Sequence, residues 1–304
     1  MSLGRASARR QRAAAATGAD AGRWRRAQRA GRRWGLWGAV LGVAIGAVLQ
    51  APAQWLAEGL HRATDARLLL AEARGSLWNG SAVLVLTGGA GSRDAAALPG
   101  RLHWQLRPNW RGLQLSAQQA CCLPGDLRLL WQPGWGSYTV TLGNGAAATV
   151  PAAPGAAGPA KPVIGHWPAA WLTGLGTPWN TLQLGGQLQL SSPGLQLQSV
   201  AGRLRLDGSL TLALQDVSSR LSTLPSLGSY RLQVQGAGRA GEATTLQLST
   251  SDGALRLSGS GQWTGARLRF VGEARAAEGQ ESALSNLLNI IGRRQGALSV
   301  ISIG

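Results

Sequence analysis

The chain has 304 residues, of which 30 are lysine or arginine and 13 are aspartate or glutamate, giving a formal net charge of +17. Charged residues make up only 14% of the chain, against roughly 25% in typical soluble domains. Glycine and proline together reach about 19%, against roughly 12% in typical usage. This composition disfavours a helical bundle and favours a β-rich chain with many turns.

The net charge is concentrated at the start of the chain. Residues 1–33 contain ten arginines and one acid, Asp20, which amounts to +9, whereas the remaining residues carry +8 spread thinly. Beside the hydrophobic segment that follows, such a run indicates a basic flank more than a nucleic-acid-binding arm. We therefore predict a basic cytoplasmic tail over residues 1–33 and no nucleic-acid partner.

A hydrophobic segment follows this tail. Residues 34–57 carry no charge, and a helix of that length extends about 36 Å, enough to cross a bilayer. Arg32 and Arg33 precede the segment, while Trp34, Trp37 and Trp55 occupy positions where aromatic rings favour the membrane interface. The positive-inside rule then predicts a single-pass inner-membrane helix, with a cytoplasmic N-terminus and a periplasmic main body.

Two targeting signals compete with a retained anchor. Ala51-Pro52-Ala53 has the small-x-small form of a signal-peptidase site, so cleavage of the segment is an alternative. The pair Arg32-Arg33 invites a twin-arginine interpretation, but the residues that follow it differ from those usual in such signals.

The second half of the chain alternates apolar and polar residues. From Leu182 to Phe270, leucines recur at every second position and are separated by Gln, Arg, Ser or Thr, which predicts half-buried strands. Turn-forming sequences lie between them at residues 185–186, 192–194, 207–208 and 252–253. We predict an antiparallel meander with one apolar face.

A less regular set of strands is predicted in the first half, at residues 83–87, 101–107, 112–117, 127–131 and 138–142. Residues 151–162 are rich in proline, alanine and glycine, which predicts a linker or surface loop. The predicted body therefore has a first periplasmic β half (58–150), a linker or loop (151–166) and a second half (167–304), with separate or continuous sheets. The fold class is mainly β: a transmembrane helix, then a curved antiparallel meander in two halves with one C-terminal amphipathic helix.

That C-terminal helix is predicted over residues 279–292. Leu284, Leu287, Leu288 and Ile291 fall at i, i+3, i+4 and i+7, and Gly292 is placed as a left-handed C-terminal cap. The apolar face of such a helix covers one end of the sheet or docks on a partner. A last strand is predicted over residues 297–303.

Residues that carry chemistry are scarce. The only cysteines, Cys121 and Cys122, are adjacent and are expected on opposite sides of a strand, in a location that permits oxidation. His61, His103 and His166 lie far apart, without the spacing of metal ligands. The sequence shows no phosphate-binding loop, no local triad signature and no carboxylate cluster. We therefore predict no enzymatic activity, no cofactor and no metal site.

Three phrases occur in order along the chain: GSLWNGSA at residues 75–82, LTGLGTPWNTL at 172–182 and LLNIIGRR at 287–294. Together they resemble the general secretion pathway protein N family of the type II secretion system, and with the hydrophobic segment the resemblance covers about residues 34–304. The arginine-rich start, the proline-rich loop and the cysteine pair depart from it. The residues that carry the resemblance are Gly75, Leu77, Trp78, Asn79, Gly80, Ala82, Leu172, Gly174, Leu175, Gly176, Pro178, Trp179, Asn180, Leu287, Leu288, Asn289, Ile290, Gly292, Arg293 and Arg294.

The resemblance implies an inner-membrane component of the machinery that exports folded proteins from the periplasm across the outer membrane of Gram-negative bacteria. It implies no catalytic residues, and its partners are other inner-membrane and periplasmic secretion subunits together with membrane lipid. Exposed edges of a β-meander can accept a partner strand in such an assembly. The alternative function is a membrane-anchored β-groove that carries lipid acyl chains, which requires that the C-terminal helix leave the apolar face open.

Most of these motif residues are interpreted as structural. Trp78 beside Asn79-Gly80 predicts a strand that enters a turn, with the indole in the core and positive φ at Asn79 and Gly80. Arg293 and Arg294 are the candidates for contact with acidic lipid or with a partner.

Overall fold

The computed structural model describes residues 37–144, 162–200, 203–237, 242–265 and 267–304. The chain divides into two compact units, Met1–Ala51 and Pro52–Gly304. In the first unit, residues 37–49 are helical. Over the ranges just given, no helix is both long enough and apolar enough to cross a membrane.

We predicted one continuous helix over residues 34–57. The described residues of this range, 37–57, do not form a single helix, so the prediction is wrong there. The first helix ends at Leu49, and helix α2 (Ala53–Ala63) begins after Pro52, whose φ of −71° and ψ of 152° are extended. Proline lacks an N–H and disfavours helical backbone in the residue before it, so the helix stops here. Trp37 and Trp55 are both exposed, on the first helix and on α2. Three of the predicted interface residues lie outside the described residues: Arg32, Arg33 and Trp34.

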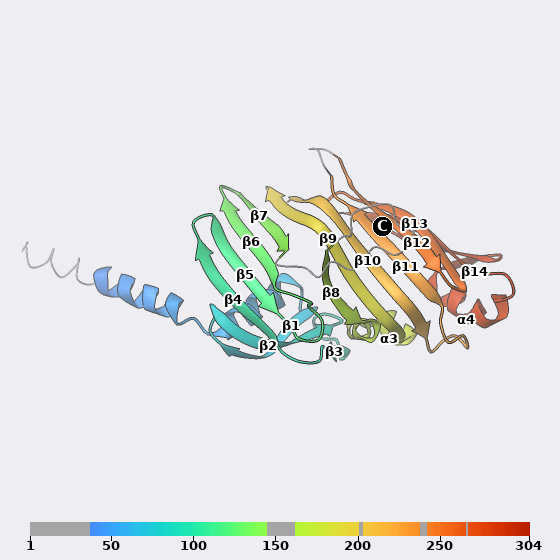
Figure 1. The fold of residues 1–304 in the computed structure, drawn as a ribbon, viewed down its shortest axis with the longest axis horizontal. Coiled ribbons are helices and arrows are strands. Elements are labelled where there is room, and N and C mark those ends of the chain that lie inside the picture. Colours follow the sequence, from blue (N-terminus) through green and yellow to red (C-terminus); the bar gives the residue numbers. More distant parts are fainter. Residues whose placement is uncertain (1–36, 145–161, 201–202, 238–241, 266) are drawn as a thin grey trace, which may run out of the picture. The chain divides into compact units, whose positions relative to one another are not determined.

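The unit Pro52–Gly304 is built on one antiparallel sheet that contains the sixteen strands of its described residues (Figure 1). The strands of the first half are β1 (Leu68–Gly75), β2 (Asn79–Thr87), β3 (Ala95–Ala97), β4 (Leu102–Asn109), β5 (Gly112–Gln118), β6 (Leu127–Gly134) and β7 (Ser137–Asn144). Those of the second half are β8 (Val163–Pro168), β9 (Leu184–Val200), β10 (Arg203–Ser219), β11 (Gly228–Gln235), β12 (Thr244–Asp252), β13 (Leu255–Trp263), β14 (Leu268–Ala276), β15 (Arg293–Gln295) and β16 (Leu298–Ile303).

The two halves share this sheet. Its main path runs β1-β2-β4-β5-β6-β7-β9-β10-β11-β12-β13-β14-β16-β15, with β3 beside β2 and β8 beside β9. Strand β7 pairs with residues 195–200 of β9, and β8 pairs with residues 187–191 of the same strand. Strand β8 therefore begins inside the range 151–166 that was predicted as a linker, while residues 151–161 lie outside the described residues.

The strands predicted in the first half and the last predicted strand are confirmed. Three of the four predicted turns in the second half are wrong, because residues 185–186, 192–194 and 207–208 lie within β9 and β10. A Cβ atom on Gly208 would lie only 2.2 Å from the carbonyl oxygen of Gly194, so these strands approach closely where β9 exchanges β8 for β7. The turn at Asp252 and Gly253 is confirmed, with a φ of 125° at Gly253.

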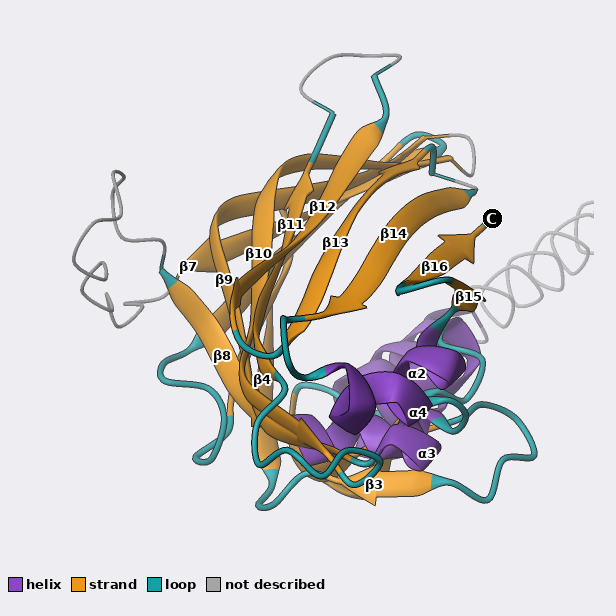
Figure 2. Ribbon diagram, turned by 90° about the vertical axis from the view of Figure 1, so that its right-hand side faces the viewer, coloured by secondary structure: helices purple, strands orange, loops and turns teal. Residues whose placement is uncertain are grey.

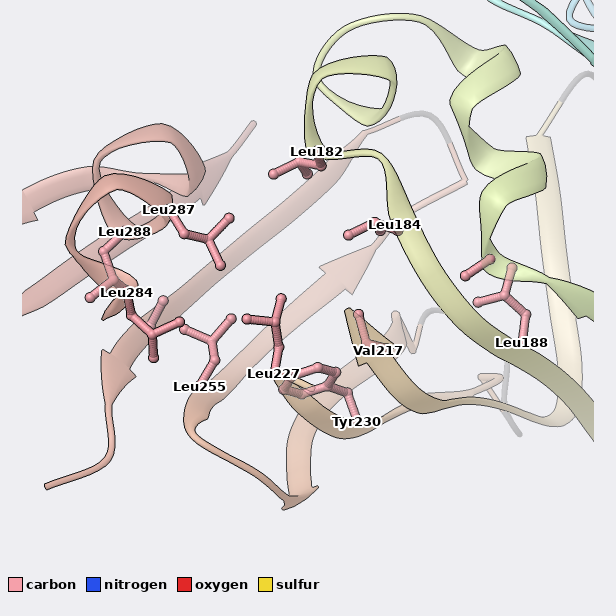
Figure 3. Close-up of a cluster of buried hydrophobic side chains, with 12 residues drawn as sticks. Leu182, Leu184, Leu188, Val217, Leu227, Tyr230, Leu255, Leu284, Leu287 and Leu288 are labelled. Carbon is pink, nitrogen blue, oxygen red and sulfur yellow. The ribbon is translucent and has the colours of Figure 1, made fainter. Parts of the chain in front are cut away.

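Three helices lie on one side of the curved sheet, as Figure 2 shows: α2, α3 (Trp179–Leu182) and α4 (Glu281–Ile291). Helix α4 is the predicted amphipathic helix, and its Leu284, Leu287 and Leu288 are buried. They pack with Leu227 and Leu255 in the main core, a cluster of buried side chains that also contains Leu182, Leu184, Leu188, Val217 and Tyr230 (Figure 3). Since burying a leucine side chain contributes about 1.5–3 kcal/mol, this face of α4 holds the helix on the sheet.

Candidate functional site

The second motif lies between β8 and β9 of the second half and contacts the first half. Its residues lie in the 3₁₀ helix η1 (Ala169–Leu175), in the bend at Gly176, where φ is 77°, and in α3 after the cis peptide Thr177–Pro178. We call residues 169–182 the η1–α3 segment. Within it, Leu172 and Trp179 pack against the main core of the second half.

The η1–α3 segment also binds the hairpin of β2 and β3 in the first half. The indole N–H of Trp171 donates a hydrogen bond of 2.9 Å to the carbonyl oxygen of Ala96 on β3. Gly174 is buried beside both strands, because a Cβ atom there would lie 2.2 Å from the carbonyl oxygen of Leu86 and 2.8 Å from the amide nitrogen of Ala96. Only a residue without a side chain fits this close approach.

A second contact joins Asn180 to the β2–β3 connection. The Nδ2 atom of Asn180 donates to Oδ2 of Asp94 at 3.2 Å, and Oδ1 of Asn180 accepts from the Thr177 hydroxyl at 3.3 Å. Both ends of the amide are therefore engaged. Next to this pair is a pocket of about 670 Å³, and its polar lining includes Asp94, Thr173, Asn180, Gln183, Ser218 and Arg220.

The first motif forms the turn between β1 and β2. The predicted positive φ at Asn79 and Gly80 is wrong, because these residues begin β2 itself and the positive φ of 89° falls on Gly75. Trp78 is only half-buried, and the buried indole in this region is that of Trp104, 3% exposed. The ring of Trp104 packs directly on Gly80. A Cβ atom added to Gly80 would lie only 2.5 Å from that ring.

Two further contacts of the first motif are hydrogen bonds with β4. The Trp104 indole donates to the carbonyl oxygen of Leu77 at 3.1 Å, and the amide of Leu106 donates to the carbonyl oxygen of Trp78 at 2.7 Å. Ala82 is fully buried beside Trp104 in a smaller core that α2 covers. The structural interpretation of this motif is supported by these contacts.

The third motif spans the end of α4 and strand β15. Gly292 does not cap the helix in a left-handed conformation as predicted, because its φ of −166° is extended. A Cβ atom on Gly292 would lie 2.5 Å from the carbonyl oxygen of Val300, so the close approach of β16 explains the glycine. The hydroxyl of Ser299, on β16, is buried and donates to the carbonyl oxygen of Leu288 at 2.6 Å.

The exposed part of the third motif is small. Asn289 and Ile290 face outward from α4, and Arg293 and Arg294 are exposed on β15. The Nε atom of Arg294 donates to the carbonyl oxygen of Gly296 at 2.8 Å, which leaves the guanidinium at the surface. These two arginines are accessible, as their proposed contact with lipid or a partner requires.

The three motifs do not meet in a single cleft. The first motif lies at the start of β2, whereas the second contacts Leu86 near the end of that strand. The second and third motifs share the main core, to which Leu172 and Trp179 contribute from one side and Leu287 and Leu288 from the other. The described contacts of the motif residues therefore hold the sheet and its helices together.

Cys121 and Cys122 differ from their prediction. They lie in the turn between β5 and β6, not on opposite sides of a strand, and they form a disulfide with each other. The carbonyl oxygen of Cys122 accepts a hydrogen bond of 2.8 Å from the amide of His166 on β8. This turn is thus a further contact between the two halves.

The hydroxyl group of Tyr230 is a buried polar group without a hydrogen-bond partner among the described residues. The Tyr230 side chain is 4% exposed in the main core. Burial raises the pKa of Tyr230 well above its ordinary value, against a smaller opposing effect of Arg256. No group of three or more His, Cys, Asp or Glu side chains in the described ranges could hold a metal ion.

Sequence reasoning missed several residues of this arrangement. Trp104 lies in a strand whose apolar and polar residues alternate. That alternation is the one feature of the sequence that indicates its burial. Asp94 and Trp171 carry no local signal, because their roles depend on partners that lie 86 and 75 residues away along the chain.

Residues 66–300 match the model of the type II secretion system protein N family. Comparisons with curated proteins and with solved structures gave no match. The matched range contains all three motifs and the sheet from β1 to the first residues of β16, and membership in this family implies a part in type II secretion. The chain therefore belongs to the type II secretion system protein N family.

Proposed function

We propose that the protein is an inner-membrane-anchored periplasmic component of the type II secretion machinery, where it acts in assembly or in contacts with other subunits. The observation that carries this proposal is the family match over residues 66–300. The uncharged residues that follow an arginine-rich start support the anchor and its orientation. The sheet then supplies surface for partner subunits on the periplasmic side.

The C-terminal edge of the sheet is suited to such a contact. Strand β15 pairs with β16 only along residues 298–300, so beyond Val300 the β16 backbone forms an edge of the sheet. Ile303 at this edge is 52% exposed. Exposed edges accept an added strand from a partner, with backbone hydrogen bonds supplying affinity.

The proposal assigns no reaction to the protein. Its family is one of secretion components, and the motif residues described above act through packing and backbone contacts. The chain accordingly needs no cofactor for the proposed role.

The alternative function, a groove that carries lipid acyl chains, is disfavoured because helix α4 covers part of the apolar face of the sheet. Leu284, Leu287 and Leu288 of α4 pack on Leu227 and Leu255, which closes that end of the apolar face to an acyl chain. We therefore keep assembly as the proposal. Tightly held lipid in the purified protein, detected by mass spectrometry, would contradict this choice.

Deletion of the gene tests the proposed function. We expect export of type II substrates to fall while the same substrates still reach the periplasm, because only the second step depends on this machinery. Complementation with the full chain is the control. Unchanged export in the deletion strain would refute a required role in secretion.

Two placed probes test the orientation and the contact surface. Alkaline phosphatase fused after about residue 60 should be active, because a periplasmic body is expected from the charge asymmetry. A photo-crosslinking amino acid at Ser302 on the β16 edge should capture a secretion subunit, whereas the same group at Ser258 should not. Ser258 is the matched control because it is exposed on β13, between β12 and β14. An inactive fusion would overturn the orientation, and equal capture at both positions would overturn the edge contact.

A further inference from the structure

Three neighbouring hairpins end in exposed aromatic or apolar side chains. Trp110 in the β4–β5 turn is 85% exposed, and Trp135 in the β6–β7 turn is fully exposed, at 105% of the reference value. Large aromatic side chains are mostly buried in folded proteins, so two fully projecting indoles on adjacent hairpins require an explanation.

Strand register places further apolar side chains beside these two. Trp131 is 42% exposed on β6, Tyr138 is 39% exposed on β7, and Val200 is 50% exposed at the end of β9. Pro133 pairs with Tyr138, and Ser137 pairs with Val200, so the β6, β7 and β9 ends are adjacent. We call this set the aromatic rim; its members are Trp110, Trp131, Trp135, Tyr138 and Val200.

The hairpins of the aromatic rim lie at one end of their strands, as Figure 1 shows for the β4–β5 and β6–β7 turns, and the paired Val200 and Arg203 of β9 and β10 lie at the same end. The β5–β6 turn with the cysteine pair and the β10–β11 connection lie at the other end. The exposed indoles are thus gathered at one end of the sheet and are not scattered over its surface.

The tips of these three hairpins carry arginine and no carboxylate, and the nearest acid, the exposed Asp207, follows them on β10. Arg111 lies 4.4 Å from the ring centre of Trp110, and Arg107 and Arg203 belong to the same hairpins. The residues 107–114, 131–140 and 196–206 contain no aspartate or glutamate. The ion pairs of the described residues do not involve these three arginines. By contrast, Asp126 stands at the opposite end of β6.

We propose that the aromatic rim docks on the headgroup region of an anionic phospholipid bilayer. Indole and phenol rings combine an apolar body with a polar group, which suits them to the boundary between headgroups and acyl chains. Arginines beside such rings are attracted by anionic lipid, and residues 107–114 and 131–140, which carry Trp110 and Trp135, contain no carboxylate to oppose that attraction. A protein partner would need a matching acidic surface, whereas a bilayer supplies both the negative charge and the apolar layer.

The place where the chain enters the β unit agrees with this proposal. Pro52 forms a β-bridge with Ser76 in the β1–β2 turn. That turn lies at the same end of the strands as the tip of β4, since Asn79 pairs with Gln105 and β4 continues to Asn109. The unit Pro52–Gly304 therefore begins at the end of its strands that carries the aromatic rim.

A fluorescent probe on the full chain in liposomes tests this docking. Asn109→Cys places an environment-sensitive label beside Trp110, and Ser226→Cys, in the β10–β11 connection at the other end, is the matched control. In vesicles of phosphatidylcholine with phosphatidylglycerol, we expect lipid-borne quenchers to reach the Asn109 label and iodide to be excluded from it. The Ser226 label should show the reverse.

The side chains of the rim are tested in the same assay. Arg111→Gln should lower the lipid-quenched fraction relative to the iodide-quenched fraction by about fivefold, the effect of one arginine near an anionic surface. Trp110→Ser combined with Trp135→Ser should abolish lipid quenching while the chain stays with the vesicles through its hydrophobic start. Circular dichroism of each variant shows whether the sheet is retained.

Three results would overturn the proposal. They are equal quenching of both labels by iodide, equal lipid quenching in vesicles without phosphatidylglycerol, and protection of the Asn109 label only after other secretion subunits are added. The last result would assign the aromatic rim to a protein partner. Because this assay does not measure export, its outcome is separate from that of the gene deletion.

Discussion

Gly174→Ala is the sharpest test of the connection between the two β halves. The added Cβ atom would lie 2.2 Å from the carbonyl oxygen of Leu86 and 2.8 Å from the amide nitrogen of Ala96, whereas ordinary contacts lie at 3.4–4 Å. Both neighbours are backbone atoms of paired strands, so neither can move aside as a flexible side chain would. The η1–α3 segment must therefore move away from the β2–β3 hairpin by more than 1 Å, roughly the overlap to be relieved.

The expected cost has two parts. Overpacking against well-packed backbone costs about 1–3 kcal/mol. The shift also weakens the 2.9 Å hydrogen bond from Trp171 to Ala96, which contributes about 0.5–1.5 kcal/mol. We therefore expect Gly174→Ala to lower the free energy of unfolding by about 2–4 kcal/mol. The corresponding fall in Tm is about 4–16 °C for a domain of this size.

Urea unfolding followed by tryptophan fluorescence measures this change. Gly59→Ala is the matched control, because Gly59 lies in α2 with nothing within 4 Å of its added Cβ atom. That control should raise stability by about 0.5–1 kcal/mol, since alanine is the better helix former. Hydrogen exchange should increase at residues 86–97 and 169–182 in Gly174→Ala alone. Stability equal to the wild type, or unchanged exchange there, would refute the packing argument.

The remaining predictions concern the main core and the Asp94 contact. Leu288→Ala should lower the free energy of unfolding by about 2–5 kcal/mol because Leu288 is 1% exposed, whereas Ile290→Ala, at a position 41% exposed, should change it by less than about 1 kcal/mol. Tyr230→Phe should raise stability by about 1 kcal/mol, because it removes a buried hydroxyl that has no hydrogen-bond partner in the described residues. Asp94→Ala and Asn180→Ala should each cost about 0.5–1.5 kcal/mol, with less than additive loss in the double variant.

Chemical denaturation measures all of these changes. Equal losses for Leu288→Ala and Ile290→Ala would contradict the burial of the α4 face. A destabilised Tyr230→Phe would show that the hydroxyl is hydrogen-bonded after all. Strictly additive losses for Asp94 and Asn180 would mean that their 3.2 Å contact contributes nothing.

Much of the fold could be predicted from the sequence, because it depends on local patterns. The alternation of Leu246 and Leu248 with polar residues places β12, and the spacing of Leu284, Leu287 and Leu288 places α4. The family could also be identified from short phrases, since glycines and tryptophans in fixed order are specific when three phrases agree. These features need only neighbours within a few residues of one another.

Turn signals failed where long-range pairing overrides them. Ser192-Pro193-Gly194 and Asp207-Gly208 are turn-forming by composition, yet they lie within β9 and β10. There they accommodate the close approach of two strands at the point where β9 changes its partner, and no local window contains both strands. At Pro52 a local effect prevailed instead. The proline ends the first helix, although the apolar character of the segment around it predicted that the helix would continue.

The sequence by itself determined the β-rich class, the amphipathic helix, the one-sided charge at the start and the family, because each is recorded in composition or in spacing along the chain. Only the tertiary structure decided that the two halves form one sheet and that Gly174 and Asn180 join them. It also decided that Trp110 and Trp135 project together from one end. Those relations depend on strand register and on contacts between residues far apart in the chain, where the free energy of packing, and not local preference, selects the arrangement.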